Sequence, residues 1–274
     1  MLQLKSVSPW VTAIYRRMLT CQDCWINVGK KQTHIFFFFD GDSHGKRIGC
    51  LRNHMGSRLI SILLARGHRV RVLARQNSLG RVPDGAIPVV GDALEAESVA
   101  AALRSGDTVV HLVGTPHPNP SKAKEFEQID LVSIRASVAA AKRVGIAQLV
   151  YVSVAQPAPI MRAYLAVRAA GERMIQEAGL TATVLRPWYV LGPGHRWAMI
   201  LVPLYKIAEL VPATRESAKR LGLVTIEQML GALVAAVENP PPNGRVQLWT
   251  WPGFDARASD GLESKFSRDR IAGR

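Results

Sequence analysis

Apolar residues recur along most of this 274-residue chain, first with helical spacing and then with strand spacing. The clearest case is Gly56–Gly67, where Leu59, Ile62 and Leu63 share one helical face. The alternating segment His68–Arg75 follows at once. This pattern predicts a helix, a tight turn and a strand that ends at a basic residue.

The alternation of helix and strand patterns continues as far as residue 186. The predicted strands are Ile87–Val90, Thr108–Val113, Gln148–Val154 and Thr181–Arg186, and the predicted helices are Ala93–Arg104, Lys122–Val144 and Met161–Ala178. Several strands are nearly continuous apolar runs, which is typical of parallel strands buried on both faces. We therefore expect an α/β protein with a Rossmann-type, doubly wound parallel sheet.

The two ends of the chain lack this regular pattern. Residues 1–45 are expected to form an irregular extension in which Ile35–Phe39 is either a strand or an aggregation-prone segment. The regular domain is expected at 46–250, with a small substrate-side subdomain at 188–250. In that part Thr225 caps a helix and Val246–Thr250 forms a late strand. Residues 251–274 are expected to be a polar tail.

The chain is strongly basic, with a net charge of +14. Eight basic residues and no acid lie between Lys46 and Arg75, a distribution that suits a phosphate-bearing ligand. The basic residues alternate with apolar ones and form no nucleic-acid module, so nucleic acid is not an expected partner.

Other features of the composition narrow the function further. No apolar run approaches the roughly 18 residues that span a bilayer, and no secretory signal is evident, so we expect no integral membrane segment and a cytoplasmic location. The three cysteines form no cluster with histidine, so no metal site is expected. His111 lies within an apolar strand and is interpreted as a core histidine rather than a ligand.

Arg75 gives the first indication of a ligand. In a dinucleotide-binding fold the adenosine ribose lies at the end of the second strand. A carboxylate there would accept from a free 2′-hydroxyl, whereas a guanidinium suits a 2′-phosphate. This favours NADP(H) over NAD(H), with a solvated strand-end charge as the alternative.

The ordered set of segments resembles the atypical short-chain dehydrogenase/reductases, in particular their NmrA-like and complex I accessory subunit-like branch. The segments that carry the resemblance are GSRLISILLARGHRVRVLAR (56–75), VVGDALEAESVAAAL (89–103), DTVVHLVG (107–114), QLVYVSV (148–154), YLAVRAAGE (164–172) and LRPWYVLGPG (185–194). They extend over roughly 46–250 and imply a Rossmann-type NAD(P) site.

The resemblance also implies roles for individual residues. Arg75 would contact the 2′-phosphate, and Asp92 would lie beside the adenine, although Asp92 could equally cap a helix. The other implied cofactor-binding residues are Gly56, Leu112, Val113, Gly114 and Pro187. Ser153 and Tyr164 match the catalytic pair, and Arg168 stands where the family usually has a lysine.

The glycine-rich turn departs from the family pattern. If Gly56 is its third glycine and Lys46–Ile48 its preceding strand, Cys50 and Asn53 replace the first two glycines. The alternative that we rank second uses Phe36–Asp40 as the first strand, followed by a turn with glycines at positions 41, 45 and 49. A third possibility is that the segment before about residue 55 is an altered or mistranslated version of the family's N-terminus.

Arg168 is the second departure. A lysine at this position would lower the tyrosine pKa and hold the nicotinamide ribose, whereas an arginine keeps the charge but is bulkier and cannot relay a proton. Two functions therefore stay open. One is an NADP(H)-dependent oxidoreductase or epimerase of an unidentified small or isoprenoid-like substrate, with Tyr164 as the acid. The other is a non-catalytic nucleotide-binding sensor or assembly subunit with a protein-complex partner.

Overall fold

Seven parallel strands form the central sheet of the computed structural model, which describes residues 34–39, 55–115, 118–158, 161–191 and 223–250. The strands are β1 His34–Phe39, β2 Arg69–Ala74, β3 Ile87–Val90, β4 Thr108–His111, β5 Gln148–Val152, β6 Ala182–Arg186 and β9 Val246–Thr250. Their order is β3-β2-β1-β4-β5-β6-β9, and every neighbouring pair is parallel. This confirms the predicted Rossmann-type sheet, whose order reverses between β1 and β4.

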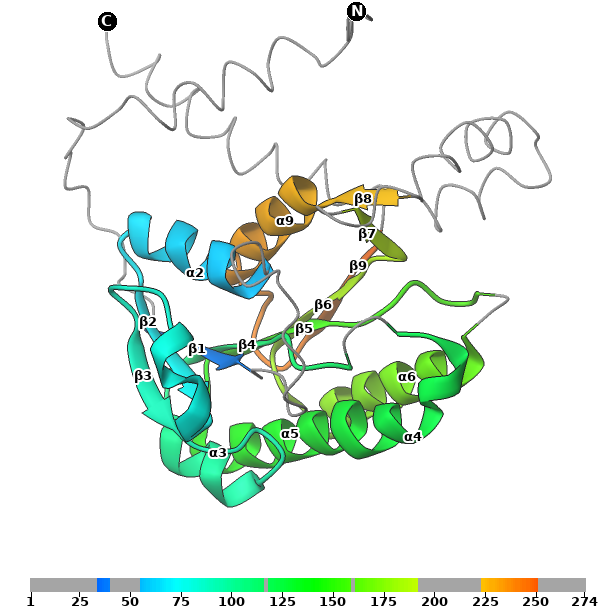
Figure 1. Cartoon of the computed structure of the whole chain (residues 1–274), viewed down its shortest axis with the longest axis horizontal. Helices are drawn as coiled ribbons and strands as arrows, with labels where there is room; N and C mark the ends of the chain where they lie inside the picture. The colour runs from blue at the N-terminus through cyan, green and yellow to red at the C-terminus, as the bar shows by residue number, and fades with distance from the viewer. Residues whose placement is uncertain (1–33, 40–54, 116–117, 159–160, 192–222, 251–274) are drawn as a thin grey trace, which may run out of the picture. The chain divides into compact units, whose positions relative to one another are not determined.

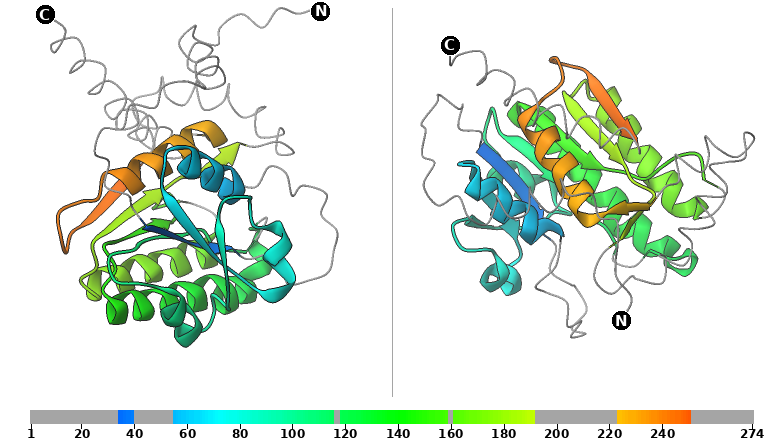
Figure 2. Two further views of the ribbon diagram at one scale, coloured as in Figure 1. Left: turned by 90° about the vertical axis from the view of Figure 1, so that its left-hand side faces the viewer. Right: turned by 90° about the horizontal axis from the view of Figure 1, so that it is seen from above.

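Helices cover both faces of the sheet (Figure 1). On one face lie α2 Met55–Ala65 and α9 Ile226–Glu238, which run beside each other in Figure 2. The other face carries α3 Ala96–Ala102, α5 Val132–Val144 and α6 Arg162–Glu177. Shorter helical segments are η1 Gln76–Arg81, η2 Pro120–Lys122, α4 Ala123–Glu125 and η3 Phe126–Leu131. A separate pair of strands is formed by β7 Tyr189–Leu191 and β8 Leu223–Thr225.

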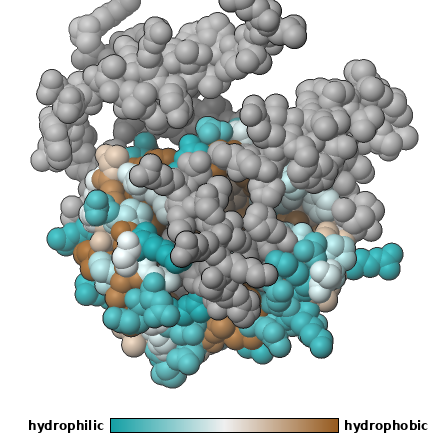
Figure 3. Space-filling view, viewed as in Figure 1, coloured by the Kyte–Doolittle hydropathy of each residue, from teal (hydrophilic) through white to brown (hydrophobic). Residues whose placement is uncertain are grey.

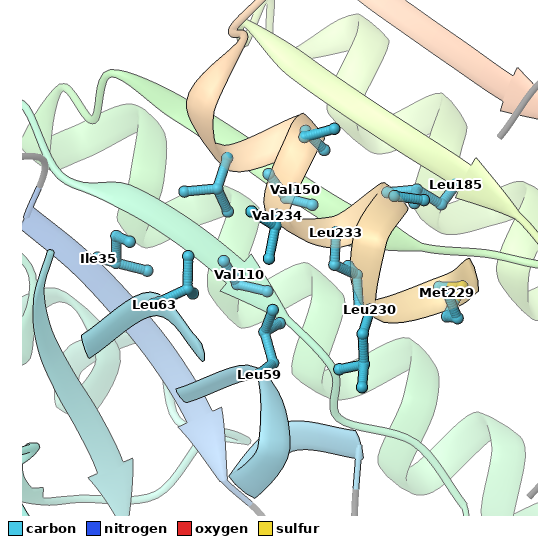
Figure 4. Close-up of a cluster of buried hydrophobic side chains, with 14 of the residues drawn as sticks. Ile35, Leu59, Leu63, Val110, Val150, Leu185, Met229, Leu230, Leu233 and Val234 are labelled. Carbon is cyan, nitrogen blue, oxygen red and sulfur yellow. The ribbon is translucent and has the colours of Figure 1, made fainter. Parts of the chain in front are cut away.

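The sheet separates two hydrophobic cores. On the α2 and α9 side, Leu59 and Leu233 pack with Ile35 of β1 and Val110 of β4 (Figure 4). On the opposite side the core contains Phe36, Leu73, Ile134, Tyr151 and Ile175. Adjacent β1 residues thus face opposite cores, and both are fully buried. Burial on both faces explains why central strands such as β4 and β5 are nearly continuous apolar runs.

The first strand corrects one of our predictions. His34–Phe39 pairs with β2 and β4, so the strand that we ranked second occupies this place in the sheet, rather than Lys46–Ile48. The sheet therefore begins before residue 46, inside the segment interpreted as an extension. The two glycine arrangements, including Cys50 and Asn53, lie outside the described residues. Gly56 itself is the second residue of α2.

Two helix predictions also need correction. The helix predicted from Ala93 begins only at Ala96, with Glu95 at its N-cap position. Asp92 instead accepts a 2.8 Å hydrogen bond from the Leu94 N–H in the turn before it. The helix predicted over Lys122–Val144 is present, but it contains a π-helical segment at Phe126–Leu131.

The described C-terminal elements pack on the main sheet and core. The strand at Val246–Thr250 is confirmed and pairs with β6, and α9 packs on the main core, so both are part of the Rossmann-type domain. The predicted cap is confirmed as a capping box, in which Thr225 accepts from the Gln228 N–H and the Gln228 side chain accepts from the Thr225 N–H.

Because helices such as α5 and α6 turn their buried residues toward the core, we expect polar residues on their outer faces. On the face in Figure 3, hydrophilic residues gather over the lower part of the described surface, where α4 and α5 lie in Figure 1. None of the helices in the described ranges combines the length and apolar character needed to cross a membrane. Within the same ranges, no three His, Cys, Asp or Glu side chains gather as metal ligands would.

Candidate functional site

Most of the predicted site residues follow the carboxyl ends of neighbouring strands. Arg75 comes directly after β2, Asp92 after β3, Leu112–Gly114 after β4, Ser153 after β5 and Pro187 after β6. Because the strands are parallel, these ends lie on the same edge of the sheet. In open α/β sheets, ligands bind in the crevice at this edge, where the strand order reverses.

The β2 and β3 ends are held in fixed turns. The Arg75 carbonyl accepts a 2.8 Å hydrogen bond from the Ser78 N–H, and the Arg75 side chain is half-buried. After β3, a Cβ on Gly91 would lie 2.6 Å from both Leu73 Cδ1 and Ser98 Oγ. Only glycine fits there without a shift, and the Asp92 N–H donates to the same Ser98 hydroxyl at 2.8 Å. Asp92 therefore projects from a tight, well-bonded turn.

Ser153 belongs to a buried polar group around Glu172 of α6. The Ser153 hydroxyl donates to Glu172 Oε1, and only 3% of Ser153 is exposed. Arg186, at the end of β6, donates to both Glu172 oxygens. Its Nε donates to Oε1 at 3.0 Å, and its Nη2 donates to Oε2. The Gln156 amide donates to the same carboxylate at 3.2 Å. Since a serine hydroxyl has one proton, Ser153 in this arrangement can accept, but not donate, a further hydrogen bond.

Arg168 belongs to a second buried group. Its Nη1 donates to the Val152 carbonyl at 3.0 Å, at the end of β5, and its Nη2 forms a 2.7 Å ion pair with Asp130. Asp130 is fully buried and also accepts from the N–H and the hydroxyl of Thr115, at 2.9 and 2.7 Å. A Cβ on Gly114 would lie 2.3 Å from Arg168 Nη2. Gly114 is therefore needed for the close approach of Arg168 to this loop.

Tyr164 lies one helical turn before Arg168 on α6. Its ring packs against Phe126 at a centroid distance of 5.0 Å, and the Arg168 guanidinium lies 5.1 Å from its ring centroid. The structure thus brings Tyr164 and Arg168 together. Ser153 and Arg168 both lie by the end of β5, but they bond to different carboxylates.

Burial and the Arg168 charge together set the pKa values of the groups beneath this edge. Burial works to lower the pKa of Arg168, but attraction to Tyr164, Tyr151 and Asp130 outweighs it, and the pKa is raised. Burial also raises the pKa of the Tyr151 hydroxyl. Burial and the nearby Arg168 charge lower the pKa of His111 to about 3. His111 is therefore a neutral core residue packed edge-on to Tyr151, as the sequence indicated.

Sequence reasoning missed the two carboxylates that organise the site, Asp130 and Glu172. Each carried a signal, because an acid stands where an inward-facing apolar residue is expected. Asp130 lies four residues from both Phe126 and Ile134, which are core residues. Glu172 lies between Gly171 and Ile175 on the buried face of α6. Buried carboxylates of this kind need partners, and here the partners are arginines.

The residues at this edge fit a dinucleotide. Arg75, a half-buried residue at the end of β2, is of the type that binds phosphate, and Asp130 fixes the loop after β4 through Thr115.

Comparisons with known proteins agree with this geometry. A family model described as NAD(P)H-binding matches residues 53–196. The chain is 24% identical to a ceramide reductase of Caulobacter vibrioides over 188 residues, which are 68% of this chain and 58% of that protein. It is 28% identical to a 3-diazoavenalumate denitrifying reductase of a Streptomyces species over 212 residues, which are 68% of this chain and 69% of that one. The chain thus spans somewhat over half the length of the first of these relatives.

Solved structures show the same fold. A UDP-glucuronic acid 4-epimerase from Bacillus cereus in complex with NAD has a TM-score of 0.55 and 17% identity, and the match covers 80% of this chain and 78% of that one. A nucleoside-diphosphate-sugar epimerase from Staphylococcus aureus has a TM-score of 0.53 and 17% identity, with 80% and 71% covered. The family match and the shared fold confirm the resemblance to short-chain dehydrogenase/reductases, and the chain belongs to the NAD(P)H-binding family.

Proposed function

We propose that this protein is an NADP(H)-dependent oxidoreductase that reduces a carbonyl group of a small organic substrate. The observation that carries the proposal is the convergence of Arg75, Asp92, Leu112–Gly114, Ser153 and Pro187 at one sheet edge, with Tyr164 and Arg168 on the adjoining α6. The two sequence relatives described above, which are named as reductases, support the same class of reaction.

Arg75 carries the preference for NADP(H). Its position directly after β2 is where the adenosine ribose lies in this fold, and a guanidinium can form two parallel hydrogen bonds with a phosphate. Asp92, after the neighbouring β3, would lie beside the adenine. Gly56, near the beginning of α2, and Pro187, after β6, complete the proposed cofactor-binding set.

Tyr164 is the proposed proton donor. When bound, the nicotinamide supplies the hydride, and the developing negative charge on the carbonyl oxygen then needs a proton. The Tyr164 hydroxyl can supply it, with the Arg168 cation 5.1 Å from the centre of the same ring. Ser153 has its proton engaged by Glu172, so its part is to accept a hydrogen bond and fix orientation rather than to donate.

A second candidate function is a non-catalytic nucleotide-binding protein, such as a sensor or an assembly subunit with a protein partner. One observation favours it. Arg168 donates through Nη2 to Asp130 and through Nη1 to the Val152 carbonyl, and the ion pair with Asp130 offsets the positive charge that would support Tyr164. A protein of this kind would bind the dinucleotide without turnover.

A deuteride-transfer experiment separates the two functions. The purified full chain is incubated with NADPH deuterated at the nicotinamide C4 and a panel of aldehydes and ketones that includes isoprenoid carbonyls. The oxidoreductase predicts a deuterated alcohol with wild-type protein and none with Tyr164→Phe, while both proteins bind NADPH with similar affinity. Binding without deuterium transfer across the panel would support the non-catalytic function, and absence of binding would contradict both.

A further inference from the structure

Asp130 occupies an unusual place in the fold. It lies in the π-helical segment Phe126–Leu131, and such segments occur often at functional sites. The side chain is fully buried and bonds in two directions. One oxygen accepts a hydrogen bond from Arg168, which lies in the first two turns of α6. The other accepts from both the N–H and the hydroxyl of Thr115.

We propose that Asp130 is a positioning residue that joins the loop after β4 to the first two turns of α6. The proposal rests on the proposed function, because these two segments carry the nucleotide-lining Leu112–Gly114 and the proton donor Tyr164. Asp130 is fully buried, so its proposed role is exerted through these two segments. It sets the distance between them.

Several buried hydrogen bonds hold the loop after β4 and α6 to Asp130. Thr115 is bound to Asp130 through two donors, so both its backbone and its side chain are fixed. The preceding Gly114 approaches so closely that a Cβ would meet Arg168 Nη2 at 2.3 Å and Asp130 Oδ1 at 3.2 Å. Arg168 in turn is held to the end of β5 through the Val152 carbonyl. A movement of either segment therefore breaks hydrogen bonds that are buried and cannot be replaced by water.

Asp130→Asn is the informative substitution. The carboxylate accepts three hydrogen bonds from two sides, whereas an amide has one acceptor oxygen and turns two donors toward the other side. In either orientation the variant loses the charge that pairs with Arg168, and its NH2 group faces either the Arg168 guanidinium or the Thr115 N–H, so it cannot keep all three hydrogen bonds. Ser137→Ala is the matched control. Ser137 is also buried, in α5, which directly follows η3, but its hydroxyl donates to the Ser133 carbonyl within the same helix.

Two measurements on the full chain test the proposal. Hydrogen–deuterium exchange is followed in residues 112–115 and 161–168, and the NADPH dissociation constant is determined. For Asp130→Asn we expect faster exchange in both segments together and about tenfold weaker NADPH binding. Ser137→Ala should change neither. Faster exchange in only one segment, or unchanged exchange with affinity within about twofold of wild type, would overturn the proposal.

A second pair of variants keeps the test decisive if Asp130→Asn does not fold. Thr115→Val removes one donor and leaves the Arg168–Asp130 ion pair, and Thr115→Ser restores the hydroxyl. The valine variant should show the faster exchange in both segments, and the serine variant should restore the wild-type rates. If wild-type protein does not bind NADPH, the proposed function fails, and the exchange rates alone then decide whether Asp130 connects the two segments.

Discussion

Gly114→Ala is expected to destabilise the protein chiefly through one steric contact, with Arg168. The added methyl group would lie 2.3 Å from Arg168 Nη2, well inside van der Waals distance. The far end of an arginine can usually move aside, but this guanidinium is pinned by Asp130 at 2.7 Å and by the Val152 carbonyl at 3.0 Å. Relief of the contact therefore requires the loss of at least one of these buried bonds.

The expected magnitude follows from that loss. Breaking a buried ion pair so that the carboxylate of Asp130 loses its counter-charge costs about 3–5 kcal/mol. Displacement of Arg168 is less severe than its removal, because part of the attraction survives, so we expect a loss of about 3 kcal/mol in the free energy of unfolding. For a domain of this size that lowers the melting temperature by roughly 6–12 °C.

Urea and thermal unfolding followed by far-UV circular dichroism measure this effect. Gly80→Ala is the matched control, since a Cβ on Gly80 meets nothing within 4 Å, and it should be nearly neutral. In an Arg168→Lys background the alanine should cost less, because the atom that it meets is gone. A Gly114→Ala protein within about 0.5 kcal/mol of wild type would refute the assignment of Gly114 to Arg168 packing.

Three further predictions concern separate parts of the molecule. Burial works to raise the pKa of Glu238, but hydrogen bonds from His68 and Arg66 outweigh it and lower the pKa to about 2. Its contribution to stability is therefore complete above the ordinary pKa of 4.5 and is lost as the pH falls toward 2, so Glu238→Gln should flatten acid unfolding curves in that range; an unchanged curve would contradict this. Thr225→Ala should cost about 1 kcal/mol in urea unfolding by removing the cap of α9, whereas a neutral result would show that the cap is dispensable. Tyr164→Phe should reduce turnover at least about 100-fold with NADPH affinity unchanged, and retained turnover would exclude this hydroxyl as the proton donor.

The sequence pattern predicted most of the fold because the central strands are buried on both faces. Apolar runs such as Gln148–Val152 and Ala182–Arg186 can be placed in a parallel sheet from composition alone. The first strand was harder to place. His34–Phe39 is followed by a segment that departs from the usual glycine pattern, so the strand was detached in sequence from the helix that should follow it.

The site was predictable only where position along the chain determines geometry. Arg75 and Leu112–Gly114 follow strand ends, and the sheet order alone brings them to one edge. Asp130 and Glu172 could not be assigned in this way, because their partners Thr115, Arg168 and Arg186 come from other elements. Long-range hydrogen bonds of this kind have no spacing signature along the sequence.

The most direct test of the account is the ratio of NADH to NADPH dissociation constants, measured by fluorescence titration of wild-type protein and of Arg75→Ala. Arg81→Ala is the matched control, because Arg81 lies at the exposed end of η1, the segment that Arg75 begins. We expect wild-type protein to bind NADPH at least about tenfold more tightly than NADH, Arg75→Ala to remove this preference, and Arg81→Ala to keep it. Equal affinities in the wild type, or a preference that survives Arg75→Ala, would contradict the placement of the adenosine phosphate at the end of β2.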